Sequence, residues 1–236
     1  LKDIEGLPMI EHVRRRAIIS KVFTQVFVVT SDKIIEKKIK EFNGKVILNK
    51  KRHMNGTSRA AEIIKKIKGD IFVILFADEP LLLPVQIRQY CKYIEKDNVS
   101  DAWNATTNLK KNDNYIHNVV KCKIDKKNFI KRLYRKKNKN SKSFKTVKSV
   151  GIMAFRRKLL LKYEKIKKTK NEKLLKIEQY RLIDNCYLLK SVMLNNVMPS
   201  INLKTDMKKT LKIIKNSTIQ KREIKKAVEF NIDVKN

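Results

Sequence analysis

Ile71-Phe72-Val73-Ile74-Leu75-Phe76-Ala77-Asp78-Glu79-Pro80 is the stretch of sequence that indicates the fold most clearly. Its apolar start is typical of a short buried strand. Asp78 and Glu79 follow at the carboxyl end of that strand, where open α/β sheets bind ligands. A carboxylate there can hold Mg²⁺, a hard cation that takes oxygen ligands and shares them with substrate phosphates. The acid could equally cap the helix expected after Pro84, and the motif alone leaves both interpretations open.

Helix and strand patterns alternate through the first half of the chain. Helical spacing predicts helices over 9–18, 33–42 and 57–67, and strands are expected over 25–30, 45–48 and 71–76. Small polar residues at 30–32 can cap the second helix, and Asn43-Gly44 can end it by supplying a left-handed position. Strands that alternate with helices in this way predict βαβ units, and therefore an α/β fold with a mainly parallel sheet.

The second half is less regular. Strands are expected over 101–107, 119–124, 129–134, 147–155 and 190–197, and helices over 84–95, 156–165, 174–185 and from Asp206 onward. Residues 135–145 are polar and rich in lysine, which favours a loop. The charge is high and the helical pattern weak from Asn216 to the end. We therefore predict one domain over 1–215, followed by a charged tail over 216–236.

Composition excludes several classes of protein. The chain has 236 residues, of which 42% are hydrophobic, enough for a folded domain of one core. Its formal net charge is +34, but lysines spread along the whole chain supply most of it. This distribution argues against specific nucleic-acid binding and predicts weak polyanion binding at low salt. Three cysteines without metal or redox spacing favour a reducing, cytoplasmic setting, and no apolar stretch is long enough to span a membrane.

Four short segments stand in an informative order. They are Asp3-Ile4-Glu5-Gly6-Leu7-Pro8-Met9-Ile10-Glu11-His12-Val13, His53-Met54-Asn55-Gly56-Thr57-Ser58-Arg59, Ala77-Asp78-Glu79-Pro80 and Ile177-Glu178-Gln179-Tyr180-Arg181. In this order and spacing the chain resembles the CMP-Kdo synthetase family, the 3-deoxy-manno-octulosonate (Kdo) cytidylyltransferases. The resemblance runs from Leu1 to about residue 215.

The resemblance implies a fold and a reaction. It implies a Rossmann-like nucleotidyltransferase fold with a β-rich insertion that forms a homodimer, in the cytoplasm. Enzymes of this family use Mg²⁺ to join CTP to an acidic keto-sugar for lipopolysaccharide synthesis, with release of pyrophosphate. Because the sugar hydroxyl attacks the α-phosphate directly, positioning and charge neutralisation are expected to account for catalysis.

The resemblance also implies roles for particular residues. Asp78 and Asp206 match the two aspartates that hold Mg²⁺, although Asp206 could also serve as a helix N-cap. Two carboxylates and phosphate oxygens together would suit that ion. The other matching residues are expected around the substrates. The nucleotide-binding residues are His53, Asn55, Gly56, Thr57 and Arg59, and the sugar-binding residues are Arg135, Glu178 and Gln179.

The chain also departs from the family pattern. Phe76-Ala77 stands where the family has Gln-Gly, Ser58 replaces an acid, and Ser149 replaces a histidine that contacts the sugar. Family members begin with a strand and a basic loop that grips the triphosphate, whereas this sequence starts at Leu1, after that loop. We interpret the sequence as a fragment of a longer protein. The departures leave two alternatives open, a related acidic sugar such as amino-Kdo or a sialic-type acid, and an inactive homologue.

Overall fold

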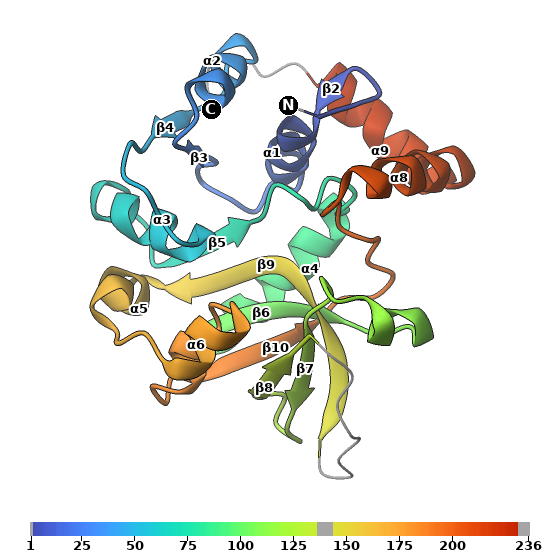
Figure 1. Cartoon of the computed structure of the whole chain (residues 1–236). Coiled ribbons are helices and arrows are strands. Elements are labelled where there is room, and N and C mark those ends of the chain that lie inside the picture. The colour runs from blue at the N-terminus through green and yellow to red at the C-terminus, as the bar shows by residue number, and fades with distance from the viewer. Residues whose placement is uncertain (1, 136–143, 231–236) are drawn as a thin grey trace. The chain divides into compact units, whose positions relative to one another are not determined.

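Strands and helices alternate along the chain, which divides into two units. The computed structural model describes residues 2–135 and 144–230 (Figure 1). Unit 1 contains the residues up to His53, then Leu75–Cys91, and the residues from Val197 onward. Unit 2 contains Met54–Ile74 and Lys92–Asn196. The division falls inside one helix, α4 (Pro84–Glu95).

Unit 1 is built around helix α1 and the elements that follow it. Its described elements are β1 (Asp3–Ile4), β2 (Leu7–Pro8), α1 (Met9–Ile19), β3 (Val28–Thr30), α2 (Lys33–Glu41), β4 (Val46–Leu48), α8 (Lys204–Asn216) and α9 (Thr218–Glu229). β1 and β2 form a short antiparallel hairpin, whereas β3 and β4 pair in parallel. The two helices and two strands expected up to residue 48 are thus present, with β3 shorter than expected, and the β1–β2 hairpin is an addition.

Helix α2 begins and ends as its flanking residues predict. The Asp32 carboxylate accepts hydrogen bonds from the amides of Ile34 at 2.7 Å and Ile35 at 3.3 Å. At the other end Asn43 takes the left-handed conformation, with φ of 52°. Gly44 is needed for a different reason, since a Cβ there would lie 2.5 Å from Cγ2 of Ile39. The Asn-Gly pair therefore ends the helix and lets the chain turn closely over it.

Residues 218–229 form a regular helix of unit 1, α9. Helix α9 buries Gln220, Ile224 and Ala227, and it packs against α1. Nη1 of Arg15 donates to the carbonyl oxygens of Ala227 at 2.8 Å and Val228 at 3.1 Å, at the carboxyl end of α9. A cation at this end of a helix also interacts favourably with the helix dipole. The weak helical pattern expected here is thus an ordered helix through residue 229.

Unit 2 contains a mixed sheet. Its strands are β5 (Ile71–Leu75), β6 (Ala102–Thr107), β7 (Lys121–Ile124), β8 (Ile130–Tyr134), β9 (Lys145–Arg156) and β10 (Leu189–Met193). The order is β10-β6-β9-β7-β8, and β5 pairs with β9. β10 runs parallel to β6, but the β6–β9, β9–β7 and β7–β8 pairs are antiparallel. The mainly parallel sheet was therefore a wrong prediction. Residues 125–129 alone join β7 to β8, too few for the crossover that parallel pairing needs.

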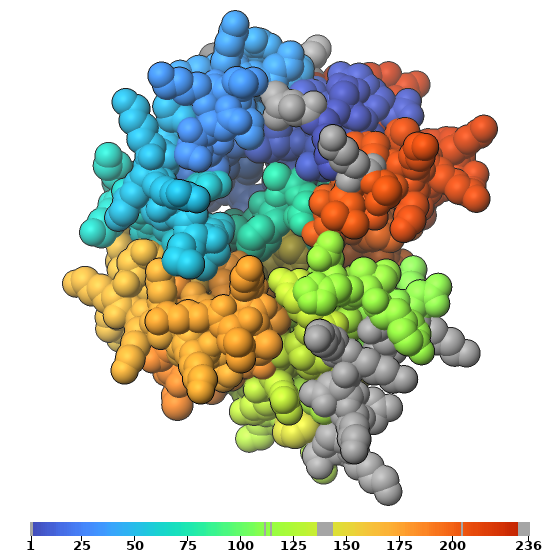
Figure 2. All heavy atoms as spheres, viewed as in Figure 1, coloured from blue at the N-terminus to red at the C-terminus, as the bar shows by residue number. Residues whose placement is uncertain are grey.

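The helices of unit 2 differ from expectation near residue 176. Those described are α3 (Gly56–Ile63), α5 (Arg157–Lys162), α6 (Lys170–Leu175) and α7 (Tyr180–Ile183). The single helix expected over 174–185 is wrong, because Lys176 takes a left-handed conformation with φ of 52° and ends α6. None of the α6 side chains is buried, and the helix forms part of the face shown in orange in Figure 2. The loop expected over 135–145 falls largely on residues 136–143, outside the described residues.

No helix among the described residues combines the length and the apolar character that crossing a lipid bilayer requires.

The buried His12 predicts how the stability of the protein depends on pH. Its ring is 1% exposed, and Nε2 lies 2.7 Å from the carbonyl oxygen of Ile4. Burial lowers the pKa of His12 to about 4, and the charge of Arg16 acts in the same direction. Since the unfolded state takes up this proton below pH 6.5 and the folded state does not, stability is lost as the pH falls from about 6.5 to about 4.

We expect this loss to reach about 3 kcal/mol at most. Denaturant unfolding at pH 7 and pH 4 measures it, with His12→Gln as the comparison, because glutamine can still donate to Ile4 but does not titrate. The variant should lose less stability than the wild type between these two pH values. An equal loss in both proteins would contradict the role of His12.

Candidate active site

Asp78 lies in the turn that follows β5, and its side chain is incompletely paired. Its backbone carbonyl accepts a hydrogen bond from the Ile201 amide at 2.8 Å. Oδ1 is buried and has no hydrogen-bond partner among the described residues. Burial raises the pKa of this carboxyl, which its own backbone amide partly offsets. Oδ1 therefore caps no helix, and a buried acceptor of this kind is unfavourable unless a ligand or cation binds it.

Asp206 has a structural role through one carboxylate oxygen, and its other oxygen makes a weak ion pair. It is the third residue of α8, not the N-cap, which is Leu203. Its Oδ2 accepts hydrogen bonds from the amides of Leu203 at 2.8 Å and Asn202 at 3.1 Å. Oδ1 lies 3.9 Å from Nζ of the exposed Lys209, a weak ion pair. The bonds of Oδ2 hold the carboxylate at the start of the helix, and Oδ1 can still bind a cation.

Asp78 and Asp206, both in unit 1, each accept a hydrogen bond from the same short segment of chain, residues 201–202. The Ile201 amide binds the Asp78 carbonyl, and the next amide, from Asn202, binds the Asp206 carboxylate. The Ser200 hydroxyl donates to Oε1 of Glu79 at 2.7 Å, which adds a third link. Among the described residues, no group of three or more His, Cys, Asp or Glu side chains could hold a metal by itself. Two carboxylates suit Mg²⁺, which completes its shell with water and phosphate oxygens.

At the start of α3, in unit 2, the nucleotide-binding candidate Thr57 contacts the sugar-binding candidate Glu178. Asn55 is the N-cap, and its Oδ1 accepts from the Ser58 amide at 2.8 Å. The Thr57 amide donates to Oε2 of Glu178 at 3.4 Å. Nε of Arg59 is buried without a hydrogen-bond partner among the described residues. The amides at this helix end thus already face a carboxylate of the chain, and Arg59 keeps a donor that an anionic ligand can take.

Glu178 and Gln179 lie in the turn between α6 and α7. Burial raises the pKa of Glu178 to about 7, while hydrogen bonds from Thr57 and the charge of Arg181 act against this shift. Nε2 of Gln179 donates to Oδ1 of Asn104, on β6, at 2.9 Å. Asn104 is not among the residues predicted from the sequence, where the one signal was a lone amide within the expected strand. The structure shows that this amide is fully buried, so it needs hydrogen-bond partners.

Arg135 and His53 contact main-chain and amide groups. Arg135 donates from Nη1 to the Asn118 carbonyl at 3.2 Å and from Nη2 to the Lys176 carbonyl at 3.4 Å. It is therefore tied to the segment just before Glu178, and burial lowers its pKa. His53 Nε2 lies 3.0 Å from Nδ2 of Asn49. His53 belongs to unit 1, whereas the other nucleotide-binding candidates belong to unit 2.

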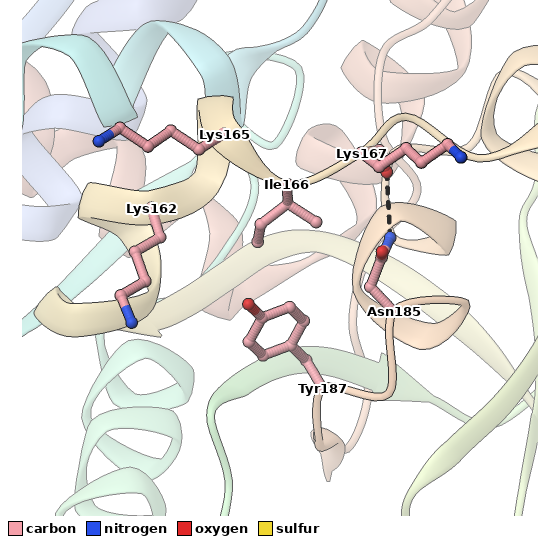
Figure 3. A pocket seen from close by; sticks show the side chains of 6 residues that line it. All are labelled: Lys162, Lys165, Ile166, Lys167, Asn185 and Tyr187. Carbon is pink, nitrogen blue, oxygen red and sulfur yellow. Dashed lines mark hydrogen bonds between the residues drawn. The ribbon is translucent and has the colours of Figure 1, made fainter.

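An open pocket in unit 2 lies apart from these residues. It has a volume of about 440 Å³ and is lined by Lys162, Lys165, Ile166, Lys167, Asn185 and Tyr187. Figure 3 shows the three ammonium groups pointing in different directions around the Tyr187 ring. Nδ2 of Asn185 donates to the Lys167 carbonyl at 3.0 Å. Because the charges do not converge, this pocket lacks the arrangement of an anion site, and none of the predicted site residues lines it.

Comparison with known proteins gives one family and many relatives. The family described as "Cytidylyltransferase" matches residues 1–194. The 3-deoxy-manno-octulosonate cytidylyltransferase of Geotalea uraniireducens is 28% identical over 230 residues, covering 91% of this chain and 92% of the relative. The enzyme of the same name from Escherichia coli is 28% identical over 187 residues, covering 78% of this chain and 76% of the relative.

Solved structures agree on the fold. CMP:2-keto-3-deoxy-manno-octonic acid synthetase complexed with CTP matches with a TM-score of 0.84 at 24% identity, covering 92% of this chain and 91% of that one. Inositol-1-phosphate CTP transferase from T. maritima matches with a TM-score of 0.65 at 11% identity, covering 98% of this chain and 88% of that one. The expected α/β nucleotidyltransferase fold is thereby confirmed, with a mixed sheet.

Replacing Asp78 should raise stability. At pH 7, Asp78→Asn removes a partly buried carboxylate whose pKa burial has raised, and it leaves a neutral group of the same shape. We therefore expect a higher thermal unfolding midpoint than that of the wild type in metal-free buffer. Calorimetry with EDTA at pH 7 measures this. A lower midpoint would indicate that the carboxylate stabilises the fold as an ordinary cap.

Glu178 should make the protein less stable as the pH rises, whereas His12 makes it less stable as the pH falls. Its pKa is raised from 4.5 to about 7, so the folded state holds this proton longer than the unfolded state does. Its contribution is therefore present below pH 4.5 and is lost as the pH rises through about 7. Glu178→Gln should remove this loss. Denaturant unfolding of the wild type and the variant at pH 6 and pH 8 measures this effect. If both proteins lost the same free energy of unfolding between these pH values, the role of Glu178 would be contradicted.

Proposed function

This chain belongs to the cytidylyltransferase family, and from that premise we propose that it joins CTP to Kdo. The products are CMP-Kdo and pyrophosphate, for lipopolysaccharide synthesis. The order of motifs along the chain and the activity for which its relatives are named support the choice of substrates. The observation that carries the proposal is Oδ1 of Asp78, which is buried and, among the described residues, has no hydrogen-bond partner; it lies beside the segment that also binds Asp206.

Asp78 and Asp206 are the residues that would hold Mg²⁺. When bound, this ion neutralises phosphate charge and so favours phosphoryl transfer. The buried carboxyl of Asp78 suits this role, because a cation would stabilise the ionised form that burial disfavours. Asp206 is oriented by two backbone amides, which fix one oxygen and leave the other for the ion.

The residues of unit 2 provide positioning for the substrates. The hydroxyl oxygen at the anomeric carbon forms a bond to the α-phosphorus, the bond between the α- and β-phosphates breaks, and pyrophosphate leaves with its electron pair. The hydroxyl proton passes to solvent or to a basic group. Glu178 and Gln179 would accept hydrogen bonds from sugar hydroxyls, and Arg59 would donate from Nε to the nucleotide. Holding the two substrates in line accounts for most of the acceleration expected from such a site.

A cytoplasmic homodimer belongs to the same proposal, supported by the family resemblance. Cys91, Cys122 and Cys186 are free, which fits a reducing compartment. Size-exclusion chromatography with light scattering measures the oligomeric state.

Release of pyrophosphate tests the reaction. We expect the protein, expressed from its complete reading frame, to release pyrophosphate from CTP only with Kdo and Mg²⁺, and EDTA to abolish the release. Asp78→Asn should lower kcat by about 100-fold or more, the scale for losing charge stabilisation of the transition state. Asp125→Asn is the matched control, because it makes the same charge change in the β7–β8 turn, where Oδ1 accepts from the amides of Lys127 and Phe129.

A panel of acceptors decides between the sugars. Kdo, amino-Kdo and a sialic-type acid with labelled CTP separate Kdo from its relatives by their values of kcat/KM. If pyrophosphate were released with amino-Kdo or a sialic-type acid but not with Kdo, the proposed reaction would stand and the proposed sugar would be wrong. No release with any acidic keto-sugar, from a protein that folds, would overturn the proposal and favour the inactive homologue.

A further inference from the structure

Asn104 holds Gln179 through a network that the proposed reaction does not require by itself. Asn104 lies on β6 of unit 2 and is fully buried. Its Nδ2 lies 2.6 Å from the Ala105 carbonyl oxygen, 3.1 Å from the Ser149 hydroxyl and 3.3 Å from the Val150 carbonyl oxygen. Its Oδ1 accepts from Nε2 of Gln179 at 2.9 Å. The polar atoms of this amide are therefore fully engaged, as a buried amide requires.

The network fixes which way the Asn104 amide points. If the amide were turned over, its oxygen would face two carbonyl oxygens, those of Ala105 and Val150, and no hydrogen bond could form to either. Nδ2 must therefore face the carbonyls, and Oδ1 must face Gln179. Since Oδ1 only accepts, Gln179 must present its amide nitrogen to Asn104.

The orientation of Gln179 follows from that of Asn104. With Nε2 bound to Asn104, the side-chain carbonyl oxygen of Gln179 is turned to the other side of its amide. Within the described parts of the chain, that oxygen receives no hydrogen bond from the protein. Gln179 is next to Glu178, whose carboxylate faces the start of α3. The turn between α6 and α7 thus presents a fixed acceptor.

We propose that Asn104 is a positioning residue that sets Gln179 as a hydrogen-bond acceptor for the acidic sugar. It selects a ligand group that donates, a hydroxyl or an ammonium, over one that can only accept. This inference rests on the proposed function, because the ligand of Gln179 is taken to be the sugar. Ser149 supports the same network from β9, where its hydroxyl lies beside both Asn104 and the buried Cys122.

The alternative is that Asn104 only stabilises the sheet, and a second residue on the same strand separates the two roles. Thr106 is also fully buried on β6, and its hydroxyl lies 2.6 Å from the Ser191 hydroxyl. Its hydroxyl hydrogen-bonds with Ser191 and with the Val192 carbonyl, and not with Gln179. Thr106→Val therefore removes a buried hydrogen bond from β6 and leaves the turn untouched.

Steady-state kinetics of the complete protein tests the proposal. Asn104→Ala should raise the KM for the sugar by about tenfold, as expected for one lost hydrogen bond, with less than about a twofold change in the KM for CTP. Thr106→Val should lower the thermal midpoint comparably and leave both KM values unchanged. Ser149→Ala, at a less buried position, should move the sugar KM in the same direction by a smaller factor. If Asn104→Ala does not fold, the Ser149→Ala result decides, and an unchanged sugar KM there overturns the proposal.

A double-mutant cycle adds a readout that a purely structural role would not change. If Asn104 acts through Gln179, then Asn104→Ala should have almost no further effect on the sugar KM in a Gln179→Ala background. Additive effects of the two substitutions, or equal changes in the KM of both substrates, would contradict the proposal.

A measurement without turnover separates this inference from the proposed function. The side-chain amide signal of Gln179 in an NMR spectrum is identified by its loss in Gln179→Ala. Its protons should exchange slowly with solvent in the wild type and rapidly in Asn104→Ala. If the protein released no pyrophosphate but this difference appeared, the sugar substrate would be wrong and the positioning would stand. If exchange were the same in both proteins, the positioning role would be overturned whatever the activity.

Discussion

Oδ1 of Asp78 is buried and has no hydrogen-bond partner among the described residues, and the proposed metal site of unit 1 depends on this constraint. Burial disfavours the charged form of this group, so the fold holds it against a free-energy penalty. Burial of apolar side chains in the core of unit 1 offsets this penalty. The core contains Ile4, Leu81, Ile201, Ile214 and Ile224, from segments widely separated in sequence. Binding of a cation to this carboxylate would therefore stabilise the folded protein.

Side chains of two helices bind the loop that follows Asp78. Nη1 of Arg16, on α1, donates to the Leu82 carbonyl at 3.2 Å. Nε2 of Gln220, on α9, donates to the Leu81 carbonyl at 2.8 Å, and the two side chains bond each other at 3.1 Å. These bonds fix the main chain within a few residues of Asp78. The carboxyl-terminal helix therefore has a structural connection to the candidate metal site, although the sequence pattern suggested a tail.

Local patterns predicted the parts of this fold that depend on neighbouring residues. The run from Ile71 to Leu75, the Asp32 cap and the end of α2 at Asn43-Gly44 follow from local physics, and each appears as expected. The break at Lys176 does not, because helical spacing continues through a residue that adopts a left-handed conformation without being glycine or asparagine. The short connection of residues 125–129 already favours antiparallel pairing of β7 with β8, but the antiparallel β6–β9 pair joins strands far apart in the chain and could not be read from single strands.

The same contrast between local and long-range information applies to the candidate site. Its residue types came from the resemblance, and Asp78 also from its place after a strand. The contact of Gln179 with Asn104 joins positions far apart in the chain, and a lone buried amide in β6 was the sole sequence signal of it. Anomalous diffraction from crystals grown with Mn²⁺ and CTP tests the central claim most directly. We predict a manganese peak bound by the carboxylates of both Asp78 and Asp206. A peak held by other residues, or ordered CTP with Asp78 turned away from any metal, would contradict the account.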